Sequence, residues 1–389
     1  MSLKVAARSA ISPFIVMDVM TAANERAAAG DEVLHLEVGQ PGTAAPGAVR
    51  AAAKAALDQD LIGYTLALGI QPLRERIRDH YRTCYGVDVE TARIVVTTGS
   101  SCGFLLAFLA AFDVGDRVAL AMPGYPAYRN ILSALGTEAV LVETEAEHRF
   151  QPTPDLLDAV QGRGDGRIDG LIVASPSNPT GTMIDRPAFQ ALVDYCADRG
   201  IRLVSDEIYH GITYDQPAVS ALELTDQAVI INSFSKYFSM TGWRLGWMVL
   251  PEDLRRPVEC LAQNFFISPP TLSQIASVAA FECRDELDGH VARYARNRAH
   301  LLKELPKAGF DRLAPADGAF YIYADVARLT NDSPEFCKRM LAETGVAATP
   351  GIDFDPDRGH RSVRFSFAGP EADIVEACER LRHWLRDGG

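Results

Sequence analysis

The chain has 389 residues, with 38 Lys and Arg against 51 Asp and Glu, so its formal net charge is −13. This length corresponds to two or three domains, and 48 % hydrophobic residues supply ample material for a globular core. The negative balance excludes a chain-wide basic footprint for nucleic acid or an anionic membrane, so small molecules are the expected partners. Only six of the 38 cationic residues are lysines, so lysine chemistry has few possible locations. The lysines are Lys4, Lys54, Lys236, Lys303, Lys307 and Lys338.

The seven cysteines are scattered, odd in number and without a Cys-x-x-Cys pair. This pattern argues against a disulfide framework and a zinc site, and it favours a reducing compartment. The longest strongly apolar stretch, 103–112, is too short to cross a bilayer, and Asp18 interrupts the apolar run near the N-terminus. We therefore expect a cytoplasmic protein without a metal site.

A strand-then-helix rhythm organises the first two thirds of the chain. Short apolar runs bounded by turn residues are typical of strands buried on both faces of a mostly parallel sheet. Amphipathic segments lie between them, such as 187–199, where apolar residues recur at helical spacing. The predicted strands are 93–97, 117–121, 170–174, 201–204, 228–231 and 245–250.

After about residue 285 the pattern changes to one typical of a smaller α+β domain. We expect a large domain over 45–285, and a small domain formed by 286–389 together with the N-terminal segment 1–44. In the small domain the sequence predicts helices over 286–307, 334–343 and 371–387, and strands over 318–323 and 362–367.

Chemically capable residues follow successive predicted strands. Ligands of open parallel sheets bind beyond the carboxyl ends of the strands, so residues that follow different strands are expected to share one site. The set contains a helix start suited to phosphate, an aromatic ring, an amide, a carboxylate, a phenol, a lysine and an arginine. These parts suit a phosphorylated pyridine aldehyde. They are Ser100, Ser101, Tyr125, Asn178, Asp206, Tyr209, Ser233, Ser235, Lys236 and Arg244.

Each of these residues also has an ordinary structural explanation. Serine is a common helix N-cap, the segment around Asn178 could be only a turn, and a single lysine is usually a solvated surface cation. Their joint occurrence after successive strands is what favours a site.

The segments 233–236 and 242–247 resemble the cofactor-lysine signature of the class I/II aminotransferases, the fold-type I pyridoxal-phosphate enzymes related to aspartate aminotransferase. The resemblance covers nearly the whole chain and implies an α/β fold. Its large domain would hold a mostly parallel seven-stranded sheet flanked by helices, beside a smaller α+β domain. Other matching segments are 39–41, 64–65, 178–181, 206–209, 350–351 and 364–366.

The resemblance implies catalytic roles for Lys236, Asp206 and Tyr209. Lys236 would bind pyridoxal 5'-phosphate covalently and then shuttle a proton, which needs an amine that can be neutral near pH 7. Asp206 would keep the pyridine nitrogen protonated. Tyr209 and Asn178 would hydrogen-bond the phenolic oxygen of the ring, and Tyr125 would stack on its face.

The resemblance also implies a phosphate site at a helix N-terminus, where unpaired N–H groups favour an anion. One of its members would come from the neighbouring subunit, so the expected assembly is a homodimer with shared active sites. The implied phosphate ligands are the amides of Ser100 and Ser101, the side chains of Ser233, Ser235 and Arg244, and Tyr64 of the neighbouring chain.

For substrate, the resemblance implies that Arg364 binds the α-carboxylate bidentately, with the Gly39 amide and Asn178 assisting. An arginine for a second substrate carboxylate cannot be identified in the sequence. The partners would be an α-amino acid and a 2-oxo acid.

The expected activity is therefore a pyridoxal-phosphate-dependent transamination by a ping-pong mechanism. A β-lyase, or an enzyme like aminocyclopropane-carboxylate synthase, stays open as the alternative, because the same cofactor residues serve both. A DNA-binding regulator is disfavoured, since no additional basic module precedes the Gly39 motif. A nicotinamide dehydrogenase is disfavoured because no Gly-x-Gly-x-x-Gly opens a helix after a strand.

Overall fold

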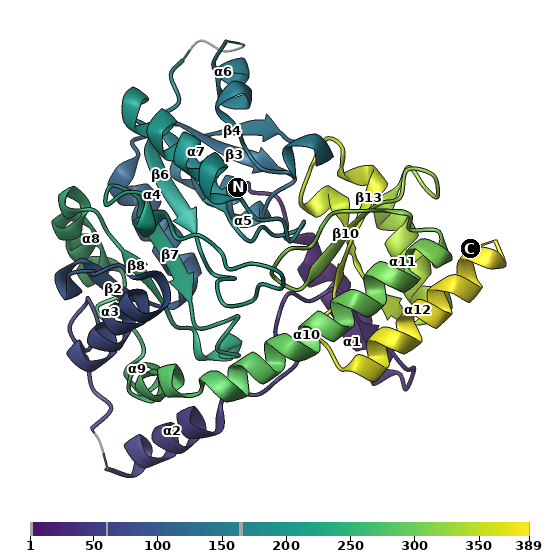
Figure 1. Cartoon of the computed structure of the whole chain (residues 1–389), viewed down its shortest axis with the longest axis horizontal. Coiled ribbons are helices and arrows are strands. Elements are labelled where there is room, and N and C mark those ends of the chain that lie inside the picture. The colour runs from purple at the N-terminus through teal and green to yellow at the C-terminus, as the bar shows by residue number, and fades with distance from the viewer. Residues whose placement is uncertain (1–2, 60, 163–165, 389) are drawn as a thin grey trace.

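The structure of the chain is a computed structural model that describes residues 3–59, 61–162 and 166–388. It consists of a large seven-stranded sheet covered by helices and a smaller α+β part beside it, linked by the long helix α10 (Arg284–Glu304) (Figure 1). The predicted fold class is confirmed.

The large sheet has the strand order β2-β8-β7-β6-β5-β3-β4. Strand β8 is antiparallel to both of its neighbours, and the other pairs are parallel, so the sheet is mostly parallel. Its strands are β2 (Ile94–Thr97), β3 (Arg117–Met122), β4 (Glu138–Glu143), β5 (Gly170–Ala174), β6 (Arg202–Asp206), β7 (Val229–Ser233) and β8 (Gly246–Val249).

Six of these strands coincide with the six predicted runs, and every end agrees within two residues. Strand β4 was not predicted. Strand β4 lies at the edge of the sheet, where Val140 and Val142 are buried but Glu138 and Glu143 are exposed. The run 139–142 between these glutamates is nevertheless continuously apolar, so the sequence carried a strand signal here that was missed.

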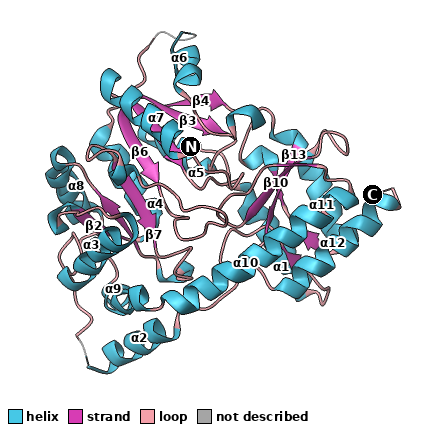
Figure 2. Ribbon diagram, viewed as in Figure 1, coloured by secondary structure: helices cyan, strands magenta, loops and turns pink. Residues whose placement is uncertain are grey.

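Helices cover both faces of the large sheet (Figure 2). Neighbouring strand residues point to opposite faces, so Val95 packs in the core beneath α4 while Val96 packs in the core beneath α3. One face is covered by α3 (Gln71–Tyr85), α6 (Pro154–Gly162), α7 (Arg186–Arg199) and α9 (Thr271–Ser277), against which α2 (Gly47–Gln59) packs. The other is covered by α4 (Gly99–Ala111), α5 (Pro126–Leu135) and α8 (Glu252–Phe265).

The smaller part contains a four-stranded antiparallel sheet with the order β12-β13-β10-β9, and a parallel pair of β1 and β11. Its strands are β1 (Leu34–His35), β9 (Arg312–Leu313), β10 (Tyr321–Asp325), β11 (Val346–Ala347), β12 (Thr349–Pro350) and β13 (Ser362–Ser366). Its helices are α1 (Ile15–Ala28), α11 (Ser333–Thr344), α12 (Glu371–Arg386) and the C-terminal part of α10.

The predicted small-domain elements are present, with one shift. The strand expected over 318–323 begins at Tyr321, because Gly318 forms an isolated bridge with Thr213 and Ala319 has a φ of 56°. A left-handed residue cannot continue a strand, so the chain turns there before it enters the sheet.

Helix α10 connects the two cores. Leu287 near its start belongs to the core of the large sheet, and Leu301 near its end belongs to the core of the smaller part. All strands of the large sheet lie within 45–285, and those of the smaller sheets lie within 1–44 and 286–389. The domain boundaries themselves stay a prediction.

Among the residues that the structure describes, no helix is both long and apolar enough to cross a membrane. No group of three or more His, Cys, Asp and Glu side chains in the same residues could hold a metal ion. All seven cysteines are free thiols, and Cys84 is the one classed as exposed. Cys84 is therefore the most accessible thiol of the molecule.

Candidate functional site

A cavity of about 500 Å³ lies at the carboxyl ends of the large-sheet strands, between that sheet and residues of α1, β10 and β13. This volume is typical of small-molecule sites. All but two of the predicted site residues line it. They are Gly39, Ser100, Ser101, Tyr125, Asn178, Asp206, Tyr209, Ser235, Lys236, Arg244 and Arg364.

Lys236 follows β7, and its Nζ donates a hydrogen bond to the Gly39 carbonyl oxygen at 2.6 Å. The Tyr209 ring centroid lies 5.6 Å from Nζ. Burial lowers the pKa of Lys236 to about 8, and the nearby Arg364 charge adds to this effect. The amine is thus much closer to neutrality at physiological pH than an exposed lysine.

Asp206 ends β6, and its carboxylate is held from two sides. Its Oδ1 accepts the Ile208 N–H at 3.0 Å, and the Tyr128 hydroxyl donates to its Oδ2. Burial raises the pKa of Asp206 to about 6, while those two hydrogen bonds and the Lys236 charge oppose the rise. A buried carboxylate that remains ionised at pH 7 suits a cationic ring nitrogen as partner.

The sequence interpretation missed Tyr128. Tyr125 precedes the first residue of α5, and Tyr128 follows three positions later, so both rings come to one side of the helix start. Their centroids are 5.2 Å apart. The spacing Tyr-x-x-Tyr shortly after the predicted strand 117–121 was the available signal.

The N-terminus of α4 faces Arg244. Gly99 begins the helix with a φ of +73°, and no side chain caps it. A Cβ at Gly99 would lie 2.6 Å from Nη2 of Arg244, so glycine allows the guanidinium to approach the helix end. Ser235 and Thr241 also line this part of the cavity, and Thr241 was not predicted. A capless helix end beside an arginine is suited to an anion such as phosphate.

Ser233 is placed differently from the other predicted residues. Its hydroxyl donates to the Leu245 carbonyl at 3.3 Å and accepts the Ser235 N–H at 3.1 Å. Ser233 thereby holds the turn that carries Ser235, and the structure does not bring it into the lining of the cavity.

Arg364 lies on β13 and is held at both terminal nitrogens. Nη1 donates to Asn178 Oδ1 at 2.9 Å, and Nη2 donates to the Glu37 carbonyl at 2.5 Å and to Thr349 Oγ1 at 3.2 Å. These bonds fix the plane of the guanidinium before any ligand arrives.

The guanidinium of Arg364 also stacks between two aromatic rings. Its Cζ lies 4.4 Å from the centroid of Tyr321 and 4.7 Å from that of Phe354. Its Nε is buried and has no hydrogen-bond partner among the described residues. A charged donor without a partner in a ligand-sized cavity fits a carboxylate of the substrate.

Tyr321, which was also not predicted, closes the wall behind Gly39. Its hydroxyl lies 2.6 Å from that of Tyr209, and a Cβ at position 39 would overlap it. Glycine at position 39 therefore allows the backbone, whose carbonyl accepts from Lys236, to run directly against the two phenols.

Tyr64 does not reach the cavity of its own chain. It lies in the segment between α2 and α3, and 84 % of it is exposed. A large aromatic side chain in this position is available to a second molecule.

The chain is similar to known proteins over nearly its whole length. Residues 31–381 match the family model described as aminotransferase class I and II. The chain is 53 % identical to the valine–pyruvate aminotransferase of Mycobacterium tuberculosis over 386 residues, which cover 98 % of each chain.

Solved structures extend the similarity to the whole fold. An aminotransferase from Mycobacterium tuberculosis matches with a TM-score of 0.96 at 52 % identity, covering 99 % of this chain and 100 % of that one. The aspartate aminotransferase from Thermus thermophilus with maleate matches with a TM-score of 0.91 at 30 % identity, covering 98 % and 100 %. The family is pyridoxal-phosphate-dependent. The chain belongs to the class I and II aminotransferases, and its reaction is the exchange of an amino group between an α-amino acid and a 2-oxo acid.

Proposed function

We propose that this cavity binds pyridoxal 5'-phosphate and that the chain uses it for ping-pong transamination between a branched aliphatic amino acid and a small 2-oxo acid. The observation that carries the proposal is the convergence of Lys236, Asp206 and the capless end of α4 on one cavity. When bound, the cofactor supplies an electron sink for the amino-acid Cα. The amine, the carboxylate and the anion site fit its aldehyde, its ring nitrogen and its phosphate.

The remaining polar groups are suited to orienting the cofactor and the substrate. Asn178 accepts from Arg364 with its Oδ1, which leaves its Nδ2 to donate, together with Tyr209, to the phenolic oxygen of the cofactor. Arg364 would hold the substrate α-carboxylate, and Lys236, once released from the cofactor, would carry the proton at the substrate Cα. Tyr125 would cover the face of the ring.

The phosphate would be held by the N-terminus of α4 and the groups beside it. The amides of Ser100 and Ser101 are the first free donors of that helix, Arg244 supplies positive charge, and Ser235 supplies a hydroxyl. Ser233 would act through the turn that it holds.

The cavity wall supports an apolar substrate side chain. Its charged residues among the described part of the chain are Asp206, Lys236, Arg244 and Arg364, and each already has a role. Phe14, Val16, Met17 and Met20 supply an apolar wall from the region of α1. Together with the similarity to a valine–pyruvate aminotransferase, this favours valine or a similar amino acid as donor and pyruvate as acceptor.

The experiment is a half-reaction panel with the cofactor-loaded protein. Valine alone is expected to convert the bound cofactor to its pyridoxamine form, followed by absorbance, and pyruvate is expected to reverse the change. Aspartate serves as the comparison, because it needs a second cation. Faster conversion by aspartate than by valine would contradict the substrate class. A β-lyase needs a leaving group on the substrate Cβ, which valine lacks, so cysteine completes the panel. Release of hydrogen sulfide, pyruvate and ammonia from cysteine, without conversion of the cofactor to its pyridoxamine form, would instead establish the lyase alternative.

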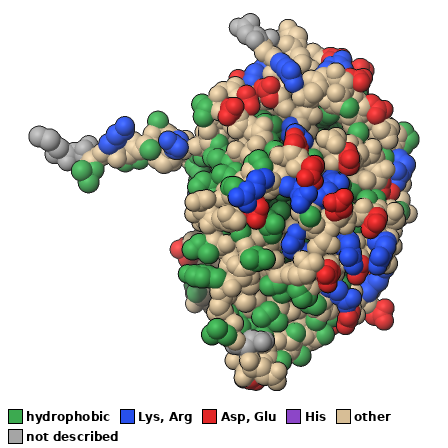
Figure 3. Space-filling view, turned by 90° about the vertical axis from the view of Figure 1, so that its left-hand side faces the viewer, with side chains coloured by type: hydrophobic (Ala, Val, Ile, Leu, Met, Phe, Trp, Pro, Cys, Tyr) green, Lys and Arg blue, Asp and Glu red, His purple; other side chains and the backbone are tan. Residues whose placement is uncertain are grey.

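We also propose a homodimer with shared active sites. The segment that carries Tyr64 exposes other apolar side chains, including Leu61 at 95 % and Leu66 at 77 %, and Phe265 at the end of α8 is 55 % exposed. The segment of Tyr64 is joined to the start of α9, because Thr271 Oγ1 donates a hydrogen bond to the Gly63 carbonyl at 2.5 Å. In Figure 3 the hydrophobic side chains gather toward the lower part of the face, where α2 lies, and the N-terminal segment projects from the body. An apolar surface of this kind is typical of an interface between subunits.

Mixed dimers test whether Tyr64 acts across that interface. Tyr64→Ala and Lys236→Ala chains are each expected to be strongly impaired alone. If the sites are shared, one site of every mixed dimer is intact, so an equal mixture recovers about a quarter of the wild-type activity. If Tyr64 acts within its own chain, no intact site forms and the mixture stays inactive, which would contradict the shared site.

Tyr128→Phe is expected to move the acid limb of the kcat/KM profile to higher pH by about one pH unit or more, because one donor to a charged carboxylate is lost. The sign follows from Asp206. The Tyr128 hydroxyl lowers the pKa of that carboxyl, so removing it raises the pKa further, and the carboxylate loses its charge at a higher pH. Tyr195→Phe is the matched control, since Tyr195 donates to Asp158 at 2.6 Å outside the cavity. An unchanged acid limb in Tyr128→Phe would exclude the proposed influence on Asp206.

We further propose that the chain works in the cytoplasm. The support is the set of seven free thiols, which is typical of a reducing compartment. Fractionation of cells that express the tagged chain is the direct test, and recovery outside the cytoplasm would contradict the proposal.

A further inference from the structure

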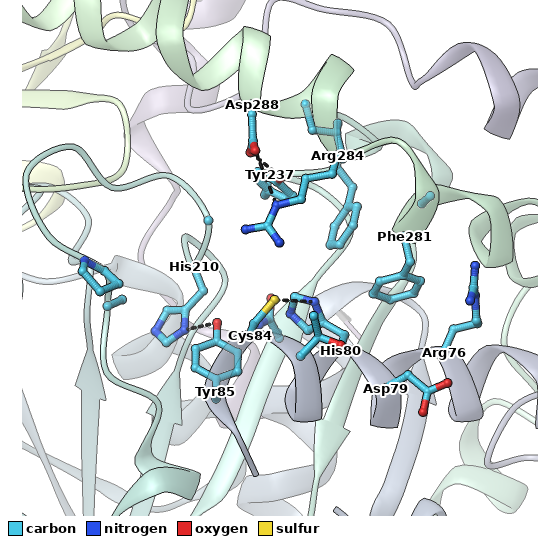
Figure 4. Close-up of a pocket in the computed structure, with 18 of the residues that line it drawn as sticks. Arg76, Asp79, His80, Cys84, Tyr85, His210, Tyr237, Phe281, Arg284 and Asp288 are labelled. Atoms are coloured by element: carbon cyan, nitrogen blue, oxygen red, sulfur yellow. Dashed lines mark hydrogen bonds and ion pairs between the residues drawn. The ribbon is translucent and has the colours of Figure 1, made fainter. Parts of the chain in front are cut away.

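A second cavity, of about 440 Å³, lies between α3, the loop after β6 and the start of α10 (Figure 4). It shares no lining residue with the cavity that holds Lys236. Its size is in the range of small-molecule sites, and none of the functions assigned above uses it.

The floor of this second cavity is aromatic and apolar. The His80 ring centroid lies 5.6 Å from that of Phe281 and 6.3 Å from that of Trp247. Phe238 and Leu287 add to the apolar lining. A ligand with an apolar body would lose its hydration shell against these side chains.

The two histidines in the lining are uncharged. Burial lowers the pKa of His80 to about 4 and that of His210 to about 3. His210 Nε2 lies 2.9 Å from the Ser175 carbonyl, which can only accept, so Nδ1 accepts from the Tyr85 hydroxyl at 2.8 Å. His80 and His210 therefore supply hydrogen-bonding groups without net charge.

The acidic side chains in the lining already have partners. Asp79 pairs with Arg82 at 2.8 Å, and Asp288 Oδ1 accepts from the Tyr237 hydroxyl at 2.7 Å. Arg76 pairs with Glu282, although its Nε is buried without a partner among the described residues. Arg76 and Arg284 thus balance Asp79 and Asp288 in formal charge, so an anion has to be held by direct contact with an arginine side chain.

Arg284 is the first residue of α10, and its guanidinium points over the cavity between Tyr237 and Cys84 (Figure 4). Its side chain is 68 % exposed, and its Nε lies 3.5 Å from Asp288 Oδ2. In the part of the chain that the structure describes, its two terminal nitrogens have no hydrogen-bond partner. Asp288 therefore contacts the Nε side of the guanidinium, while the two terminal nitrogens, which can bind an anion bidentately, are free among the described residues.

We propose that this cavity is a second ligand site, for a small organic monocarboxylate with an aromatic or branched aliphatic body. The carboxylate would pair with Arg284, and the body would lie against Phe281 and His80. A second charge on the ligand would have to enter among neutral and apolar side chains, which is unfavourable.

The position of the cavity connects it to the proposed active site. Tyr237 directly follows Lys236, and its hydrogen bond to Asp288 ties that turn to α10, which continues into the core of the smaller part. His210 directly follows Tyr209, and it bonds the Ser175 carbonyl at the start of the segment that carries Asn178. A ligand in this cavity would shift the positions of Tyr237 and His210, and with them the segments that carry Lys236 and Asn178. We therefore infer that it changes the rate of amino transfer, an inference that rests on the proposed function.

Cys84 provides a local measurement of binding, because it lines this cavity and is exposed. Its alkylation by iodoacetamide, followed by mass spectrometry, is expected to slow about tenfold when phenylacetate is added at ten times its Kd. Cys260, which does not line the cavity, is the internal reference. Equal alkylation of Cys84 with and without phenylacetate would overturn the proposal.

Variants assign the protection to this cavity. Arg284→Gln is expected to abolish it, whereas Arg255→Gln is expected to retain it, since Arg255 is another helix-start arginine, paired with Glu252 at 2.6 Å. Protection that persists in Arg284→Gln would overturn the proposed carboxylate contact. Arg364→Leu is expected to keep the protection, and its loss there would assign the effect to the active site instead.

Kinetics separate the binding from its effect on catalysis. Phenylacetate competing at Arg364 would raise only the apparent KM, whereas binding beside Arg284 is expected to change kcat by at least about twofold. Arg284→Gln should remove the change in kcat and leave the competition. Protection of Cys84 without any change in kcat would overturn the coupling. Protection in a protein that transfers no amino group would refute the proposed function while supporting the site.

Discussion

Lys236→Ala is expected to lower the rate of amino transfer by about four orders of magnitude or more, and to remove the visible absorbance of lysine-bound cofactor. Two properties of the amine are lost together. It is the group proposed to bond the cofactor aldehyde, and it is the base whose pKa burial lowers to about 8. Rapid-quench kinetics and absorbance spectra of the same preparation measure the two losses.

Lys236→Arg and Lys303→Ala complete this experiment. Lys236→Arg keeps the positive charge between Asp206 and the Gly39 carbonyl but removes the nucleophile, so it is expected to be as inactive as the alanine variant. Lys303 lies on α10 with its side chain 73 % exposed, and its loss should change neither readout. An intact absorbance band in Lys236→Ala would refute the assignment of Lys236.

The strand ends were the most predictable part of the molecule. A buried parallel strand is a largely continuous apolar run, and its carboxyl end is marked by polar residues, as with Asp206 at the end of β6 and Lys236 shortly after β7. The sequence could thus predict that these side chains share an edge of the sheet. Strand β4 was missed although its apolar run 139–142, bounded by Glu138 and Glu143, is of the same kind.

The residues that support the site were the least predictable. Tyr128, Tyr321 and Phe354 act through contacts between segments far apart in the chain, and apart from the Tyr-x-x-Tyr spacing no local pattern indicates such contacts. Ser233 is the opposite case, a predicted site residue that does not line the cavity. It lies in the matching motif, but its hydroxyl bonds within its own turn. The second cavity is likewise a product of packing, because its residues come from α3, two loops and α10.

Arg364→Leu is expected to reduce kcat/KM for the amino donor by about 100-fold or more, because the charge-assisted hydrogen bonds to its carboxylate are lost. The bonds to Asn178 and the Glu37 carbonyl hold the guanidinium in place before substrate arrives, so its binding energy is not reduced by reorganisation. Arg364→Lys keeps the charge without the planar fork and is expected to recover only part of the loss.

Arg74→Lys is the matched control for Arg364, because Arg74 is also a buried arginine that donates to backbone carbonyls, those of Ile94 and Thr91. It is expected to lower the melting temperature without changing KM. If Arg364→Leu loses stability but binds the donor with an unchanged KM, Arg364 has a structural role only, and the carboxylate must be bound elsewhere.

Removing Arg364 has a second consequence, at Lys236, and this consequence separates the charge of Arg364 from its shape. The positive charge of Arg364 helps to lower the pKa of the lysine, so its loss raises that pKa toward the value of an exposed amine. In the cofactor-free protein Lys236 then becomes neutral only at higher pH, so the rise with pH of the rate at which it binds added pyridoxal 5'-phosphate should move in the alkaline direction. Arg364→Lys keeps a cation at this position and should keep the pH profile close to that of the wild type. A profile that moves equally in both variants would show that shape, and not charge, connects Arg364 to Lys236.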